Sequence, residues 1–398
     1  MSPSIETDVN RPAVPWEGAT ITAEVDVEPG TQEDAVTRHV ALVVDASGSM
    51  GGENIERARD GASWIFGLLD PDDYVTIVAF DSSAEVVLRP TRWGDTSREA
   101  AMDHVEDLTA GGGTDMFDGL ETARDALESI AYGNDTDAVS RILLLSDGKD
   151  NEHDPAAFAD LAETIDESGI RIKAAGIGTE YNEETIRTLG TKGRGEWTHL
   201  EAPGDIEAFF GEAVEAARDV VAADARLELD VANGVEVSEV YRALPQAQEV
   251  DPDWTDNTAV VKLPDLTERD HQRVVMKVHA PALDGEGEET HTLADLTLSA
   301  SNTEATGMLT VTYSDDGETL AQQNEAVQLD HRQTVIKTEL GRGNVEAAET
   351  QVERMTKIHG EDVDAVQEAE RQTQLVKEGG RAERNRATKI VDDEGVQR

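Results

Sequence analysis

The feature that most constrains this chain is an apolar run joined to a Gly- and Ser-rich segment and then to a helical pattern. Residues 39–44 (HVALVV) form the run, and DASGSMGGEN follows directly. Apolar residues then recur three and four positions apart from Ile55 to Leu69. Such a run is typical of a strand buried on both faces of a sheet, and the later spacing indicates an amphipathic helix. The segment therefore predicts a buried strand, a loop and a covering helix.

The same alternation continues to about residue 217. Further strands are expected at residues 74–80, 84–88, 141–145, 170–177 and 196–200, and helices at residues 97–108, 117–130, 155–166, 183–189 and 206–217. Alternating buried strands and amphipathic helices predict an α/β fold with a doubly wound, mostly parallel, Rossmann-like sheet. Ligands bind such sheets at the carboxyl ends of the strands. The loops after Val44 and Leu145 fall at that edge.

The remaining sequence predicts additional parts around this α/β domain. Beyond residue 221, strand-like segments separated by Pro, Gly, Asp and Asn indicate a β-sandwich. Residues 327–340, 345–359 and 363–377 carry apolar stripes at helical spacing. The expected division is an N-terminal polar arm and strand (1–37), the α/β domain (38–220), the sandwich (221–316), a helical segment (317–378) and a disordered tail (379–398). The early strand at residues 19–27 is expected to pair into the sandwich.

The charge balance excludes several kinds of partner. Asp and Glu total 84 against 34 Lys and Arg, which gives a formal net charge of −50 in 398 residues. Such a surface repels phosphate backbones and anionic lipids, so we expect no nucleic-acid partner and no membrane-surface partner. An acidic binding surface is one explanation of the charge. Because the acids are spread along the whole chain, adaptation to a salty cytoplasm explains them better.

The cysteine count and the hydropathy of the sequence limit the possible chemistry and the expected cellular location. The chain has no Cys, which excludes disulfides, thiolate metal sites and Cys nucleophiles. Its first residues lack the pattern of a secretory signal, and no twin-Arg pair is present. No apolar segment approaches the roughly 20 residues of a transmembrane helix. The cytoplasm is the expected location, with no membrane insertion.

The loop after the first buried strand carries a cluster of oxygen donors. Asp45, Ser47 and Ser49 stand at alternate positions around Gly48, which permits a tight turn. Hard oxygen donors suit Mg²⁺, Mn²⁺ or Ca²⁺ rather than Zn²⁺. The alternative interpretation is a helix N-cap, in which Ser47 or Ser49 caps the helix containing Ile55.

Two further loops favour the metal interpretation. Thr114 lies in the segment GGGTD, and Asp147 follows the buried strand at residues 141–145 in the segment SDG. Together with Asp45, Ser47 and Ser49, these residues resemble the metal-ion-dependent adhesion site of the von Willebrand factor A (VWA) family. That site reads D-x-S-x-S, then a separate Thr and a separate Asp. The blocks VVDASGSMGG, YVTIVAFD, GGGTDMFDGL and ILLLSDG also resemble the family's strand–loop blocks in the same order, from residue 39 to about residue 211.

The resemblance implies a ligand set and a mode of binding. It implies that Ser47, Ser49 and Thr114 ligate the ion by their hydroxyls, and that Asp45 and Asp147 bind directly or through water. It also implies an open coordination position for an Asp or Glu carboxylate of a partner protein. We therefore expect a Mg²⁺-dependent protein-binding module, with Mn²⁺ or Ca²⁺ as alternative ions, in a multi-domain prokaryotic protein of haloarchaeal type. The sequence does not indicate an oligomeric state.

Competing interpretations remain open at this point. Asp45 after a buried strand could be the phosphoryl-accepting nucleophile of a Mg²⁺-dependent enzyme, but Ser47 stands where such enzymes place a second acid. A scaffold with a vestigial metal site is a third function. Asp150, Glu152, His153 and Asp154 could hold a second cation, although a solvated acidic loop is the simpler interpretation. Asp115 and Asp118 could orient ligands or cap a helix.

Overall fold

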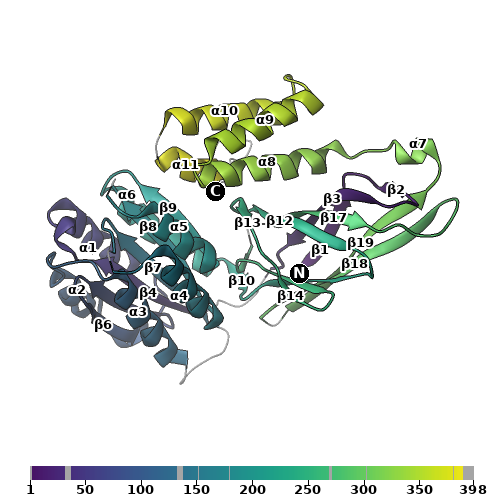
Figure 1. Ribbon diagram of the computed structural model, residues 1–398. Helices are drawn as coiled ribbons and strands as arrows, with labels where there is room; N and C mark the ends of the chain where they lie inside the picture. Colours follow the sequence, from purple (N-terminus) through teal and green to yellow (C-terminus); the bar gives the residue numbers. More distant parts are fainter. Residues whose placement is uncertain are drawn as a thin grey trace. The chain divides into compact units, whose positions relative to one another are not determined.

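The computed structural model describes residues 2–31, 37–131, 138–150, 152–178, 180–268, 271–301, 303–379 and 381–388. The chain divides into two compact units. One unit comprises Met1–Gln32 and Val221–Arg398, and the other comprises Glu33–Val220. In sequence, the second unit is therefore inserted into the first. Figure 1 shows the elements of both units.

The inserted unit is built on a six-stranded sheet. Its strands are β4 (Arg38–Asp45), β5 (Tyr74–Phe80), β6 (Ala84–Arg92), β7 (Val139–Ser146), β8 (Ile170–Ile177) and β9 (Glu196–Leu200). Their order is β6-β5-β4-β7-β8-β9, and all neighbours are parallel except the antiparallel pair β5–β6. Every residue of β4 is buried, as its apolar run predicts. The predicted α/β fold with a mostly parallel sheet is confirmed.

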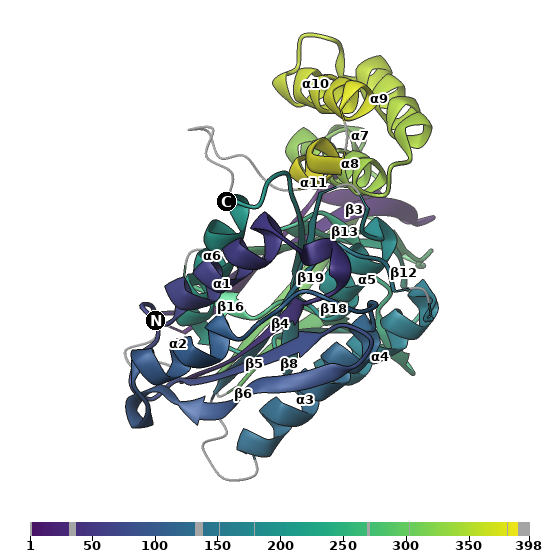
Figure 2. The same ribbon diagram turned by 90° about the vertical axis from the view of Figure 1, so that its left-hand side faces the viewer.

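Helices cover both faces of this sheet. They are α1 (Glu53–Ile65), α2 (Arg98–Glu106), α3 (Met116–Ala131), α4 (Pro155–Glu167), α5 (Glu183–Lys192) and α6 (Asp205–Arg218). Buried side chains of α1, α2 and α6 form one apolar cluster with the sheet, and those of α3, α4 and α5 form another. Figure 2 shows α1, α2 and α6 on one side of the strands and α3 and α4 on the other. The strand order changes side at β4: β5 and β6 lie on one side of it, and β7, β8 and β9 lie on the other. In sheets of this kind, ligands bind beyond the carboxyl ends of the strands at such a point.

The other unit contains a sandwich of two mainly antiparallel sheets. One has the order β1 (Ser4–Val9), β3 (Ala19–Glu28), β17 (Gln272–Ala280), β12 (Glu236–Leu244) and β13 (Gln248–Glu249). The second has the order β14 (Asp253–Thr255), β15 (Thr258–Lys262), β11 (Arg226–Val231), β18 (Glu289–Ala300), β19 (Thr303–Ser314) and β2 (Ala13–Pro15). Short strands β10 (Val220–Ala222) and β16 (Leu266–Thr267) pair separately. One apolar cluster joins the inner faces of the two large sheets.

The N-terminal segment belongs to this sandwich. The strand expected at residues 19–27 is β3, and it pairs with β17 from Ala19–Ala280 to Val27–Gln272. The expected polar arm up to residue 18 instead carries β1 and β2, which pair with β3 and β19. In β1 every second residue is exposed and the residues between are half-buried or buried, but only Ile5 and Val9 are apolar, so its sequence, SIETDV, gives a weak strand signal.

Helices complete the same unit: α7 (Gly317–Leu320), α8 (Glu325–Gly341), α9 (Val345–His359), α10 (Asp364–Glu378) and α11 (Arg381–Thr388). Helix α8 packs on the first sheet, where Val335 contacts a small cluster of Tyr241, Ala243 and Val275. Its other side joins α9 and α10 through Ile336 and Leu340. Part of the expected disordered tail is helical, as α11, and residues 389–398 lie outside the described residues. None of the described helices is both long enough and apolar enough to cross a lipid bilayer.

Candidate metal centre

The loop between β4 and α1 is held at the carboxyl end of the sheet by its backbone. Asp45 is the last residue of β4, and the N–H of Ala46 donates to the carbonyl of Phe80 at the end of β5, at 2.8 Å. The N–H of Gly48 donates to the carbonyl of Gly112 at 3.4 Å, which joins this loop to the segment between α2 and α3. Three segments distant in sequence therefore meet at one edge.

The two serines of this loop do not cap α1. Ser47 precedes a short 3-10 turn, Gly48–Met50, and makes no side-chain capping bond. Helix α1 begins at Glu53 after Gly52, which has no side chain to offer. The N-cap interpretation of Ser47 and Ser49 is therefore wrong, and their hydroxyls are directed elsewhere.

Those hydroxyls connect the two aspartates. Oδ1 of Asp45 accepts the N–H of Ser47 at 2.8 Å, and the hydroxyls of Ser47 and Ser49 lie 3.0 Å apart. The Ser49 hydroxyl donates to Oδ1 of Asp147 at 2.7 Å. A continuous series of hydrogen bonds thus runs from the end of β4 to the loop after β7.

Thr114 closes this group from the third loop. A Cβ atom added to Gly148 would lie 3.0 Å from the Thr114 hydroxyl and 3.3 Å from Oδ2 of Asp45. Thr114 and Asp45 therefore both face the small space beside Gly148, next to Asp147 in sequence. The structure brings together all five residues that the sequence predicts as ligands: Asp45, Ser47, Ser49, Thr114 and Asp147.

The site is buried at one side and open at the other. Asp45 is fully buried and Asp147 is 7% exposed, whereas Ser49 is exposed. Burial is the largest influence on Asp45 and raises the pKa of its carboxyl. Hydrogen bonds from Ser146 and Ser47 partly oppose this rise in the pKa, and the negative charge of Asp147 adds to it. The protein alone therefore disfavours the charge on Asp45, so a nearby cation would be favourable.

Two residues that hold the aspartates were missed by the sequence interpretation. The Ser146 hydroxyl donates to Oδ2 of Asp45 at 2.5 Å, and the amide of Asn54 donates to Oδ2 of Asp147 at 2.9 Å. Ser146 stands directly before Asp147, so the SDG segment contained a signal for it. Asn54 lies in the first turn of α1, and nothing in its spacing distinguishes it from an ordinary helix residue.

The group fits a hard divalent cation. It offers hydroxyl and carboxylate oxygens, as Mg²⁺, Mn²⁺ and Ca²⁺ require. Gly148 leaves a space between Thr114 and Asp45 that a larger residue would fill. The hydrogen-bond donors that the structure places on Asp147 are the neutral groups of Ser49 and Asn54. These two bonds bring no cationic side chain to Asp147 that would compete with an ion.

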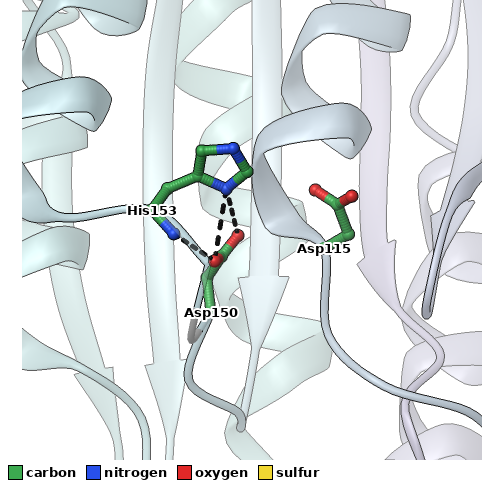
Figure 3. A group of neighbouring side chains, drawn as sticks. All are labelled: Asp115, Asp150 and His153. Atoms are coloured by element: carbon green, nitrogen blue, oxygen red, sulfur yellow. Dashed lines mark hydrogen bonds and ion pairs between the residues drawn. The ribbon is translucent and has the colours of Figure 1, made fainter.

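A second group of metal-ligand types lies beside this site (Figure 3). One ligand atom each of Asp115, Asp150 and His153 lies within 4.8 Å of the others. Each aspartate already has a structural role. Asp115 accepts the N–H of Asp118 at the start of α3, and Oδ1 of Asp150 accepts the N–H groups of Glu152 and His153. The expected solvated loop is wrong at Asp150, whose side chain is 2% exposed because it folds back onto this turn. These bonds account for the group without an ion.

Comparisons with known proteins agree with this geometry. The family model described as von Willebrand factor type A domain matches residues 39–212. An uncharacterized protein of Synechocystis sp. is 28% identical over 247 residues, covering 60% of this chain and 56% of that protein. A von Willebrand factor A domain-containing protein of Dictyostelium discoideum is 27% identical over 170 residues, covering 42% of this chain and 17% of that protein. The chain thus spans less than two thirds of the length of either relative.

Two solved structures share the fold over nearly the whole chain. A von Willebrand factor type A protein from Catenulispora acidiphila superposes with a TM-score of 0.78 at 18% identity, covering 94% of this chain and 89% of that one. The ArnB paralog VWA2 from Sulfolobus acidocaldarius gives a TM-score of 0.65 at 17% identity, covering 98% and 97%. The sandwich and helices are therefore part of an architecture that prokaryotic proteins share. Residues 39–212, which contain the parallel sheet, are thus similar in sequence and fold to the von Willebrand factor type A domain.

Proposed function

We propose that this protein binds a divalent cation of the Mg²⁺ type at the carboxyl edge of the parallel sheet and uses it to bind a protein partner. The observation that carries the proposal is the convergence of Asp45, Ser47, Ser49, Thr114 and Asp147 from three loops. VWA domains commonly mediate protein binding, which supports the same function.

The residues have distinct roles in this proposal. Ser47, Ser49 and Thr114 would supply hydroxyl oxygens, and Asp45 and Asp147 would supply negative charge. The bound ion would supply a Lewis-acidic position for a partner's Asp or Glu carboxylate. Ser49 is exposed, so the partner would approach from its side of the site. Ser146 and Asn54 would keep the two aspartates in place.

The geometry around Asp45 favours binding over phosphoryl transfer. A nucleophilic carboxylate needs an accessible oxygen. Asp45 is fully buried, its Oδ1 accepts from Ser47 and its Oδ2 accepts from Ser146. A vestigial site is also disfavoured, because every donor type is retained and the donors converge. We therefore propose a non-enzymatic binding module.

Direct metal binding tests the first half of the proposal. We expect the full chain to bind Mn²⁺, as a spectroscopic substitute for Mg²⁺, in titrations followed by electron paramagnetic resonance, and Mg²⁺ to compete. Ser49→Ala removes one exposed donor and should weaken binding. Ser83→Ala is the matched control, because Ser83 is exposed in the β5–β6 turn and its side chain holds no member of the site. Equal affinities for the two variants would rule out the assigned ligand set.

Affinity capture tests the second half. The immobilised protein is incubated with a lysate of its source organism at matched salt, once with Mg²⁺ and once with EDTA. The variants Ser49→Ala and Ser83→Ala are treated in the same way. A protein retained by the wild type and Ser83→Ala with Mg²⁺, and lost with EDTA or Ser49→Ala, supports the proposal. Retention that ignores both metal and substitution would place partner binding elsewhere on the chain.

A further inference from the structure

Helix α8 contacts two surfaces, and the two contacts differ in kind. Figure 1 shows α8 between the strands of the sandwich and the helices α9 and α10. Towards the helices, Ile336 and Leu340 of α8 join a large apolar cluster with buried side chains of α9, α10 and α11. Towards the first sheet of the sandwich, a smaller apolar cluster takes Val335 from α8. The main apolar contact of α8 is therefore with the other helices, and we call α8–α11 the helical module.

The side of α8 that meets the first sheet is mostly polar. Four residues recur at spacings of three or four positions and so lie on one side of the helix: His331, Val335, Thr338 and Arg342. The ring of His331 lies edge-on to the ring of Tyr241 in β12, with 5.7 Å between the ring centroids. Arg342 donates to Glu249 of β13 at 2.7 Å. Thr338 lies between Val335 and Arg342 in this stripe and therefore faces the sheet as well.

Two buried polar groups of this stripe lack hydrogen bonds. Nε2 of His331 and the hydroxyl of Thr338 are buried without a hydrogen-bond partner among the residues that the structure describes. Glu239 of β12 stays 3.7 Å from Nε2 of His331, beyond hydrogen-bond distance. Burial, to which the charges of Lys277 and Arg332 add, lowers the pKa of His331 to about 3, so its ring is neutral. Because both groups gain hydrogen bonds when water reaches them, they favour separation of α8 from the sheet.

The ion pairs between α8 and the sheet are partly open to solvent. Asp330 lies 3.2 Å from Arg273 of β17, and Arg342 lies 2.7 Å from Glu249. The four side chains are between 29% and 40% exposed. Ion pairs that water reaches contribute little to stability, so these two pairs do not lock α8 to the sheet.

The first residues of α8 are attached to the sandwich in another way. Asn324 caps the helix, since its Oδ1 accepts the N–H of Ala326. Its Nδ2 donates to Oδ2 of Asp8 at 2.7 Å, and its backbone N–H donates to the carbonyl of Asn10 at 2.8 Å. This end of α8 also continues the chain that comes from β19 through α7. The attachment at Asn324 can therefore act as a pivot for the rest of the helix.

We propose that the helical module is a detachable lid, which swings about Asn324 and covers or uncovers the outer face of the first sheet. The module keeps its apolar core in both positions, because that core is formed by side chains of residues 329–387. Opening brings water to His331 and Thr338 and exposes Val275 of β17, which Val335 covers in the closed position. The lid belongs to the unit that lacks the candidate metal ligands, so it does not depend on the proposed function.

Single cysteines test the opening, because the chain has no cysteine of its own. Val275→Cys places a thiol on the face that α8 covers, and Val274→Cys places one on the inner face of the same strand. Ala348→Cys places a thiol in the core of the module. With a thiol reagent at neutral pH, Val275→Cys should react at least about tenfold faster than the other two variants, because local opening is easier than unfolding of either part.

Two results of this labelling would overturn the proposal. Equal rates at the three positions would show that the face under α8 opens only when the whole unit unfolds. A reaction of Ala348→Cys as fast as that of Val275→Cys would show that the helices melt instead of detaching.

Thr338→Val, made in the Val275→Cys background, tests the cause of the opening. It removes the unsatisfied hydroxyl and keeps the shape of the side chain, so the thiol should react about tenfold more slowly. Thr334→Val is the matched control, because Thr334 is also buried on α8 but its hydroxyl donates to the carbonyl of Asp330 at 2.8 Å. This control should not slow the reaction. Any destabilisation by the cysteine cancels in this comparison, and equal rates for the two threonine variants would overturn the proposal.

Discussion

The positions of two carboxylates at the candidate metal centre depend on residues that are not among the proposed ligands. Asn54 donates to Asp147, and Ser146 donates to Asp45. Each aspartate thereby has one oxygen fixed by a neutral side chain, which sets its orientation without neutralising its charge. Residues that orient metal ligands in this way usually affect metal affinity nearly as strongly as the ligands themselves. The residue-scale predictions therefore concern such supporting positions.

Asn54→Ala should lower Mn²⁺ affinity by about 10–100-fold, the usual effect of losing a supporting hydrogen bond to a ligand. The freed Oδ2 of Asp147 would lose its fixed orientation. Calorimetric titration with Mn²⁺ measures the change. Glu53→Gln is the control, because Glu53 is the neighbouring exposed residue of α1 and pairs only with Arg57 in the described structure. An unchanged affinity for Asn54→Ala would show that Asp147 needs no such support.

Gly148→Ala should weaken metal binding while the fold is retained. The new methyl group would lie 3.0 Å from the Thr114 hydroxyl and must displace it. Overpacking typically costs about 1–3 kcal/mol, so a loss of about tenfold in Mn²⁺ affinity is expected. Gly204→Ala is a matched control, since nothing lies within 4 Å of the added methyl group. If both variants bind Mn²⁺ equally, Thr114 is not a ligand.

At the scale of elements, the sequence predicts those helices and strands whose apolar residues follow a clear period. Strands β5, β8 and β9 begin and end at the predicted residues, because each is a short strand-like segment bounded by turn residues. The five candidate ligand residues were predictable from the order of their strand–loop blocks. The N-terminal strands were not, since β2 has only three residues and pairs with β19, about 300 residues later. Trp64 of α1 is 55% exposed although its neighbour Ile65 is buried, because helical periodicity defines the centre of an apolar stripe better than its edges.

Helix α8 packs on the sandwich partly through a cluster of charged side chains, and hydrophobic periodicity in the sequence does not predict this cluster. Arg273 of β17 contacts Asp26 at 2.7 Å, Asp330 of α8 at 3.2 Å and Glu24 at 3.4 Å. One positive charge thus faces three acids. Glu24 is 8% exposed. Its burial raises its pKa to about 8; Arg273 opposes this rise and the charges of Asp330 and Asp26 add to it. The excess acid is therefore accommodated as a protonated carboxyl in the folded protein.

This cluster predicts a stability that falls as the pH rises. Glu24 has a pKa of about 8 when folded against 4.5 as its ordinary value, so the folded protein holds a proton that the unfolded chain releases. The contribution of this bound proton to the free energy of unfolding is complete below about pH 4.5 and is lost as the pH rises through about 8. The slope in the free energy of unfolding is at most about 1.4 kcal/mol per pH unit.

Denaturant unfolding across this pH range measures the effect. Glu24→Gln should flatten the dependence and leave the protein more stable than the wild type at alkaline pH. Glu304→Gln, at an exposed position of β19, should retain the wild-type dependence. If Glu24→Gln and the wild type show the same slope, the proton is held by another group.

For the molecule as a whole, the dominant long-range interaction is the repulsion among acidic side chains in a chain of formal net charge −50. Carboxylates repel one another in the folded state more than in the expanded unfolded chain, because folding brings them closer. Local ion pairs offset little of this, since 34 cations cannot neutralise 84 acids. The repulsion would also oppose the approach of the proposed acidic partner to the candidate metal centre. Dissolved salt should therefore affect both stability and partner binding in the same direction.

Raising KCl from 0.01 M to 1 M shortens the screening length from about 30 Å to about 3 Å, so the melting temperature should rise steeply over this range. Circular dichroism with EDTA present measures it without a contribution from bound divalent ions. Sucrose at matched osmolality is the control, because it stabilises by exclusion from the protein surface and leaves charge repulsion unscreened. If sucrose raises the melting temperature as much as KCl does, repulsion between carboxylates does not limit the stability. A rise specific to KCl identifies salt as a condition of folding, and metal and partner binding should then be measured at high salt.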